Sequence, residues 1–139
     1  MGQKRASRQL VRALDTNVLI RLFVADDAEQ SGVAAGVMTT PVFVPLTVIL
    51  ETAWVLRSCY RYSRAQTATI LSALLDYDTV TVDTPELVNW AIDRFAVAGD
   101  FADLLHIVGS APASGFATFD RGVARAAGGD PPLPVETLA

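Results

Sequence analysis

Four short apolar runs, separated by segments long enough to form helices, constrain the fold of this chain more than any other feature. The runs cover residues 11–14, 42–44, 80–82 and 116–118, and each is too short to be anything but a strand. Strands that are joined through helices run parallel in a sheet. The alternation therefore predicts an α/β fold with a short, mainly parallel central sheet of four to five strands flanked by helices.

Helical periodicity and capping residues predict helices between these runs. The expected helices cover residues 17–24, 29–38 and 46–60, then from Ser63 to about residue 75, from Thr84 to about residue 97, and from Asp100 to about residue 110. The total of 139 residues is near the commonest size of one domain. We therefore expect one domain over residues 11–139, preceded at residues 1–10 by a disordered basic arm or a vector-derived segment.

The charge balance argues against a protein that binds nucleic acid through a basic face. The chain has 11 Lys and Arg against 15 Asp and Glu, a formal net charge of −4, and three of the basic residues lie in the first ten positions. Any site that handles phosphate groups should therefore use bound cations. One Cys and one His exclude an internal disulfide and metal sites rich in those residues. We expect a reducing, cytoplasmic location, with no membrane span and no signal peptide.

Two acids lie just after predicted strands. Asp15 comes after the first strand and Asp120 after the fourth, which places both at the carboxyl edge where open parallel sheets bind their ligands. Each acid also has a local interpretation. Asp15 can cap the helix that follows it, and Asp120 can stabilise a turn or pair with Arg121.

Two more acids, Glu51 and Asp103, lie in predicted helices. The helix around Glu51 is apolar on nearly every side and is expected to be buried, with no basic residue three or four positions from Glu51. A buried, unpaired carboxylate is costly, so Glu51 should find a distant arginine, be protonated, or face a cleft that holds metal. Asp103 lies three residues after Asp100, which is the better helix cap, and both acids can complement the helix dipole.

Together, the four acids predict a site for divalent cations. Several carboxylates in one cleft repel one another and raise each other's pKa unless divalent cations occupy the site. Oxygen ligands without His or Cys select Mg²⁺ or Mn²⁺ over zinc. Such ions can activate a water molecule and stabilise charge on a phosphodiester, so the net acidity of the chain is no obstacle to a nucleic-acid substrate.

Four segments form an ordered set along the chain. They are Asp15-Thr16-Asn17, the helix around Glu51, Gly99-Asp100-Phe101-Ala102-Asp103 and Thr118-Phe119-Asp120. In this order and spacing they resemble the PIN domain, and in particular the VapC-type toxins of bacterial toxin–antitoxin pairs, over about residues 12–135.

The resemblance implies a metal-dependent endoribonuclease that hydrolyses RNA phosphodiester bonds with Mg²⁺ or Mn²⁺. The catalytic and metal-binding acids that it implies are Asp15, Glu51, Asp103 and Asp120. The supporting residues are Asn17 and Thr118, which match positions that form hydrogen bonds in the family, and Asp100, which can orient metal-bound water. The resemblance also implies the toxin of a type II toxin–antitoxin system that is cytoplasmic, forms a homodimer and binds a cognate antitoxin protein.

The alternative is a catalytically degenerate PIN domain that acts as an RNA- or protein-binding module. Loss of one acid would be its sign, and all four acids are present. Domains of the haloacid dehalogenase type are disfavoured, because Asn17 stands where they have a second Asp. Those domains and receiver domains also need a lysine late in the chain, whereas the only lysine is Lys4.

The remaining candidate side chains are aromatic residues, one histidine and a group of arginines. The aromatic residues are expected in the core or in an interface rather than stacked on bases: Trp54, Trp90 and Tyr60. His106 is expected on a helix surface. The arginines that cluster after Glu51 either meet RNA phosphates or form a solvated face: Arg57, Arg61 and Arg64.

Overall fold

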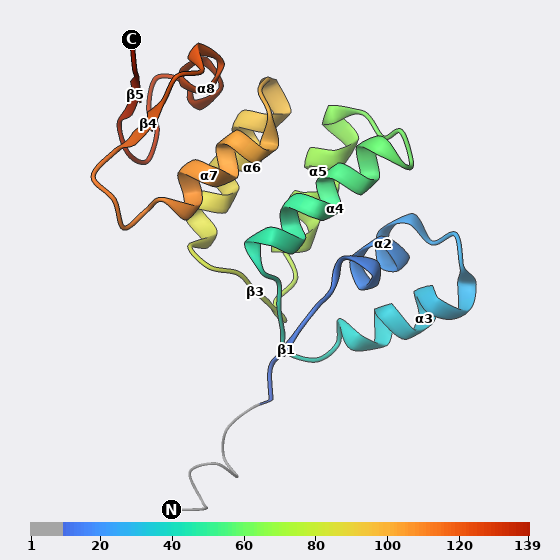
Figure 1. Cartoon of the computed structure of the whole chain (residues 1–139). Coiled ribbons are helices and arrows are strands. Elements are labelled where there is room, and N and C mark those ends of the chain that lie inside the picture. Colours follow the sequence, from blue (N-terminus) through green and yellow to red (C-terminus); the bar gives the residue numbers. More distant parts are fainter. Residues whose placement is uncertain (1–9) are drawn as a thin grey trace, which may run out of the picture.

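Two short parallel sheets organise the computed structural model, which describes residues 10–139 (Figure 1). The first sheet has the order β1 (Arg12–Ala13), β2 (Val42–Phe43), β3 (Val80–Thr81). The second sheet pairs β4 (Phe116–Thr118) with β5 (Val135–Thr137). The predicted α/β class and the parallel pairing are confirmed, and the strands are divided between two sheets instead of forming one.

Seven helices surround these strands in the part of the chain that the structure describes. They are α2 (Thr16–Val24), α3 (Ala28–Val37), α4 (Leu46–Ser58), α5 (Arg64–Leu75), α6 (Pro85–Val97), α7 (Phe101–Gly109) and α8 (Arg121–Ala127). The first six match the predicted helices to within two residues at each end. The last helix, α8, and the strand β5 are absent from the predicted elements.

Two of the predicted helix caps behave differently. Ser63 caps α5 as predicted, and its side chain forms a reciprocal capping box with Gln66. Thr84 precedes α6, but its backbone lies in the left-handed region with φ 44° and its side chain makes no capping hydrogen bond. Thr84 therefore occupies the predicted N-cap position without a side-chain cap, and Pro85 in the first turn favours the start of α6.

The helices form three neighbouring groups (Figure 1). The pair α2–α3 packs together on one side, α4 to α7 form the middle of the molecule, and α8 lies with β4 and β5 at the other end. Ala13 pairs with Phe43, and Phe43 pairs with Thr81, so the carboxyl ends of the first three strands lie together at one edge. Asp15 follows that edge directly, as predicted for an acid after the first strand.

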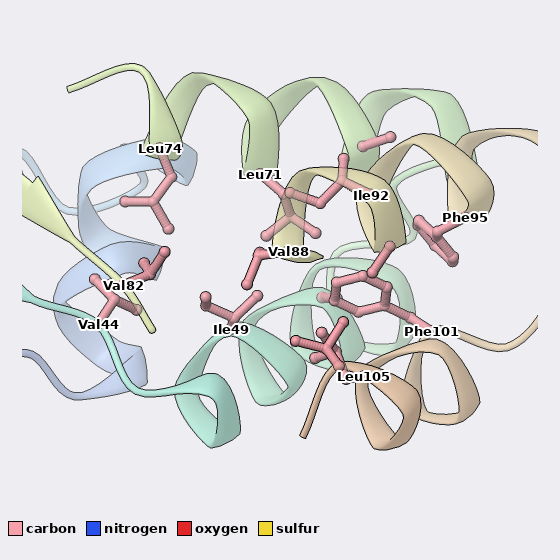
Figure 2. Packing of buried hydrophobic residues seen from close by; sticks show 14 of the residues in the cluster. Val44, Ile49, Leu71, Leu74, Val82, Val88, Ile92, Phe95, Phe101 and Leu105 are labelled. Carbon is pink, nitrogen blue, oxygen red and sulfur yellow. The ribbon is translucent and has the colours of Figure 1, made fainter. Parts of the chain in front are cut away.

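The main hydrophobic core lies between the first sheet and helices α4 to α7 (Figure 2). Residues that follow the strands, such as Val44, pack with Ile49 of α4 and Leu71 of α5, and all three are fully buried. Burial of each such side chain contributes about 1.5–3 kcal/mol. A second, smaller cluster joins α7 and α8 through Ile107 and Val123. The acids of the candidate site lie on or next to elements of these two clusters: α4 contributes to the main core, α8 mainly to the smaller cluster, and α7 to both.

The N-terminal arm that is predicted for residues 1–10 lies, apart from Leu10, outside the described residues. The longest uncharged stretch, residues 31–50, is divided among α3, β2 and the start of α4. Within residues 10–139, no helix combines the length and the apolar composition that crossing a membrane requires.

Candidate functional site

Two of the predicted site acids, Asp15 and Glu51, meet at the N-terminus of α2. Asp15 caps α2, and its Oδ1 accepts a hydrogen bond of 2.8 Å from the backbone N–H of Thr16. The hydroxyl of Thr16, whose side chain is buried, donates a hydrogen bond to Oε1 of Glu51 on α4. Thr16 therefore joins a carboxylate of α4 to the residue that follows the first strand. We call Asp15, Thr16 and Glu51 the hydrogen-bonded group.

The expectation that Glu51 is buried is wrong. Glu51 is exposed, and α4 buries only the face that includes Ile49, Ala53 and Leu56. Trp54, on the exposed side of α4, keeps 62% of its surface accessible. The reason is that, within residues 10–139, α4 packs mainly on α2, α5 and α7, and Glu51 and Trp54 lie on the face that these helices leave exposed. Glu51 consequently needs no buried arginine, and the hydroxyl of Thr16 is its partner.

Three further acids lie at the starts of α7 and α8. Asp100 caps α7, as predicted, and its Oδ1 accepts a hydrogen bond of 2.8 Å from the N–H of Ala102. Asp120 caps α8, and its Oδ1 accepts a hydrogen bond of 2.7 Å from the N–H of Gly122. Asp103 follows Asp100 in the first turn of α7. We call Asp100, Asp103 and Asp120 the crowded group.

Asp103 is the member of this group whose ionisation is most disturbed. Burial raises the pKa of its carboxyl above the ordinary value, and the negative charges of Asp100 and Asp120 raise this pKa further. His106 acts in the opposite direction. Because Asp120 lies 17 residues from Asp103, this repulsion shows that the packing of α8 on α7 brings distant carboxylates together.

The predicted supporting residues differ in where they lie. The hydroxyl of Thr118 accepts a hydrogen bond of 3.0 Å from the N–H of Asp120, so Thr118 fixes the backbone from which Asp120 projects. Asn17 is exposed and lines a separate groove between α2 and α3 together with Val18. His106 is exposed on α7, as expected of a helix-surface histidine.

The acids of the two groups form a donor set that suits a divalent cation by its chemistry. All the acids supply hard oxygen ligands, which suit Mg²⁺ and Mn²⁺. The pKa of Asp103 is raised first by burial and then by the negative charges of Asp100 and Asp120, and a cation would relieve the repulsion from those charges. Within residues 10–139, however, no three Asp, Glu, His or Cys side chains lie close enough together to hold one ion. The residues thus fit a cation by chemistry, and the structure brings them together as two groups.

A groove that the sequence reasoning missed begins beside these acids. It has a volume of about 530 Å³ and is lined by α4, the start of α5, the end of α6 and the turn before α7. Trp54 and Arg57 of α4 line it, and so does Asp100. Trp54 was expected in the core or in an interface, and its 62% exposure rules out the core. Its spacing of three residues from Glu51 is the signal that places both side chains on neighbouring positions of one helix surface.

Comparison with models of known protein families matches the chain to the PIN domain over residues 12–129. The matched segment begins with β1 and ends just after α8, so it includes both groups of acids. Comparison with curated proteins finds no match.

Proposed function

The chain belongs to the PIN domain family, and from this premise we propose that it is a Mg²⁺- or Mn²⁺-dependent endoribonuclease that serves as the toxin of a type II toxin–antitoxin system. PIN domains are in general nuclease modules, and they usually depend on a divalent metal. The proposal adds the RNA substrate, the identity of the metal and the toxin role to that general activity.

The observation that supports the nuclease most directly is the crowding of carboxylates around Asp103. Burial raises the pKa of Asp103, and repulsion from Asp100 and Asp120 raises it further; a divalent cation would relieve that repulsion. The residues that would hold the metal are Asp15 and Glu51 of the hydrogen-bonded group and Asp103 and Asp120 of the crowded group. When bound, the metal would supply an activated water molecule and stabilise negative charge on the phosphodiester.

The protein's own contribution is to fix the positions of the acids. Asp15 caps the N-terminus of α2 and Asp120 caps that of α8. Each of these acids uses Oδ1 for its cap, which leaves Oδ2 for a ligand. Thr16 orients Glu51 by a hydrogen bond, and Thr118 holds the backbone of Asp120.

Cleavage of RNA by the purified chain tests this proposal. We expect new RNA ends with Mg²⁺ or Mn²⁺ present, none in excess EDTA, and almost none with Asp103→Asn. Asp93→Asn is the matched control, because Asp93 is an exposed acid on α6 that belongs to neither group. Undiminished cleavage in EDTA would contradict the metal dependence. Equal rates for Asp103→Asn and Asp93→Asn would remove Asp103 from the site.

The toxin role depends on binding partners, and the surface supplies apolar area for them. Val33 on α3 is 66% exposed and borders a groove of about 280 Å³ between α2 and α3. An apolar groove of this kind suits a partner helix or a second copy of the chain. We therefore propose that the chain forms a homodimer and binds a cognate antitoxin encoded next to it.

Expression in a bacterial host tests the toxin role. Expression of the chain alone should arrest growth, and co-expression of the neighbouring gene should restore it. A purified chain that is monomeric and does not bind the product of that gene would contradict this part of the proposal and leave the nuclease part untouched.

One observation favours the alternative function, a PIN domain that binds RNA or protein without cleaving it. In the described part of the chain, three metal-ligating side chains are nowhere close enough to share an ion. Calorimetric titration with Mg²⁺ separates the two functions. Saturable binding that Asp103→Asn weakens supports the nuclease, and absence of binding together with absence of cleavage supports the binding module.

A further inference from the structure

The groove between α4 and the turn before α7 combines an exposed aromatic ring with a positive charge. The Trp54 ring is 62% exposed in this groove, and the Arg57 side chain is exposed one helical turn further along α4. Asp100, a member of the crowded group, lines the same groove. The groove volume of about 530 Å³ lies in the range of sites that bind small molecules.

The two arginines of this groove have different roles. Arg64 is part of the wall, because its Nη1 donates hydrogen bonds of 2.9 Å to the carbonyl of Phe95 and 2.6 Å to that of Gly99. The guanidinium of Arg57 lies over the Phe95 ring, 5.6 Å from the ring centroid. Within residues 10–139, Arg21–Asp26 is the one ion pair. No acid in that part of the chain therefore pairs with Arg57 to neutralise its charge.

The groove is continuous with the candidate site along α4. Glu51, Trp54 and Arg57 follow one another at intervals of three residues and form one ridge of the helix surface. Six residues of α-helix span about 9 Å along the axis. The Trp54 indole therefore lies further along α4 than the Glu51 carboxylate, and the Arg57 guanidinium lies further still.

We propose that this groove binds one unpaired nucleotide of the RNA substrate, next to the phosphodiester that the acids cleave, with its base on Trp54 and its phosphate on Arg57. This inference rests on the proposed nuclease function. Stacking on an exposed aromatic ring beside a cation is the usual way in which proteins hold single-stranded RNA. The chain has a formal net charge of −4 and therefore repels RNA over most of its surface. An RNA phosphate would bind best to an arginine that no acid neutralises, such as Arg57.

A peptide from a protein partner is the competing occupant, and the groove suits it less well. An apolar peptide segment would bury the guanidinium of Arg57 without a partner for its charge, which is unfavourable. A base and its phosphate provide both a stacking surface and a counter-charge. A base can stack on Trp54 only when it is unpaired, so duplex RNA should be a poor substrate.

Kinetics with a short single-stranded RNA of mixed sequence test the inference. Trp54→Ala and Arg57→Ala should each lower kcat/KM by about tenfold, mainly through KM, since the groove binds substrate beside the reacting bond. Trp54→Phe and Arg57→Lys should each lower kcat/KM less than the alanine substitution at the same position. The matched controls are Tyr77→Ala and Arg12→Ala. Tyr77 is an exposed aromatic residue after α5, and Arg12 is an exposed arginine at the start of β1. Both control variants should cleave the RNA at the wild-type rate.

Binding is measured separately from cleavage on the Asp103→Asn background. The same RNA should quench tryptophan fluorescence, and adding Trp54→Phe should remove most of that quenching, because the other tryptophan, Trp90, is half-buried against the core. Thermal melts should show that the groove variants fold like the wild type, since both side chains are exposed.

Three outcomes would overturn the inference. If the wild type cleaves RNA and Trp54→Ala cleaves it equally well, the groove proposal fails and the nuclease function stands. If cleavage is unchanged but Trp54→Ala no longer binds the product of the neighbouring gene, the occupant is a protein. If the wild type cleaves no RNA at all, the nuclease function fails first and the groove proposal fails with it.

Discussion

The two groups of acids use the same kind of side chain in opposite ways. In the hydrogen-bonded group, the hydroxyl of Thr16 donates to Glu51, and Asp15 is occupied by its helix cap. In the crowded group, Asp103 faces the charges of Asp100 and Asp120, and its pKa is raised. The first group is therefore stabilised by contacts within the protein. The second contains repulsion that only a proton or a cation relieves.

The difference follows from how the elements are packed. The hydrogen-bonded group joins α2 and α4, which both contribute to the main core. The crowded group depends on the contact of α8 with α6 and α7, where Arg94 donates a hydrogen bond of 2.9 Å to the carbonyl of Ala126. Gly99, with φ 98°, lies so close to Ala126 that a Cβ would be 2.5 Å from the Ala126 Cβ. The turn before α7 is thus pressed against α8, and this contact brings Asp120 toward Asp103.

The largest predicted effect concerns activity, in which the two groups should behave alike. Glu51→Gln and Asp103→Asn should each reduce RNA cleavage by about 100-fold or more, because in the proposed function both groups supply ligands to the metal. In EDTA, however, Asp103→Asn should raise the melting temperature, since it removes repulsion, whereas Glu51→Gln should not raise it, since glutamine can still accept the hydrogen bond from Thr16.

Cleavage assays at equal folded concentration and thermal melts in EDTA measure these effects. If Asp103→Asn melts lower than the wild type, Asp103 is part of a stabilising contact and the contrast between the two groups is wrong. If only one of the two variants loses activity, only that group belongs to the catalytic site.

The next effect is the stabilisation of the folded chain by metal. At a Mg²⁺ concentration of one hundred times the dissociation constant, the free energy of unfolding should rise by about 2.7 kcal/mol, provided that the unfolded chain binds negligibly. The free energy of unfolding of Asp103→Asn should rise less with Mg²⁺, because this variant lacks one metal ligand and the repulsion that the ion would relieve. Chemical denaturation with EDTA and with Mg²⁺ measures both increments, and equal increments would assign Asp103 a purely structural role.

Most of the fold could be predicted because its signals are local. The capping box of Ser63 and the short apolar runs each lie within a few residues of the element that they define. The short helix α8 was missed because seven residues are too few to show helical periodicity, although Asp120 at its start and Gly128 after its end are both helix-boundary signals.

The environment of the site could be predicted less well than the fold. The partner of Glu51 is Thr16, which lies 35 residues away, so no local pattern identifies it. The apolar composition of α4 predicted burial on all sides, but it cannot reveal that the neighbouring helices leave the face of Trp54 uncovered. Asp120 was predicted at a sheet edge, and its repulsion with Asp103 depends on packing of α8 that the sequence did not reveal.

A smaller effect should follow from loss of the contact that defines the hydrogen-bonded group. Thr16→Val keeps the shape of a buried side chain but removes the hydroxyl that orients Glu51. The free energy of unfolding should fall by about 1 kcal/mol, and cleavage should fall about tenfold. Thr16→Ser should restore most of the activity because it returns the donor. Failure of Thr16→Ser to differ from Thr16→Val would show that the hydroxyl does not position Glu51.

The smallest effect is the pH dependence of the crowded group without metal. The pKa of Asp103 is raised in the folded protein, so the folded state binds this proton more tightly than the unfolded state does. The resulting stabilisation is complete below the unfolded pKa of about 3.9 and is lost as the pH rises through the folded pKa. In EDTA, Asp103→Asn should therefore match the wild type at acid pH and become the more stable of the two as the pH approaches neutrality. The difference should be small, because Asp103 is partly exposed and solvent screens its neighbours. Urea denaturation of both proteins across this pH range measures this difference in the free energy of unfolding. A difference that shrinks toward neutral pH would contradict the prediction, because it would show that the charged form of Asp103 is stabilised by its neighbours more than it is repelled.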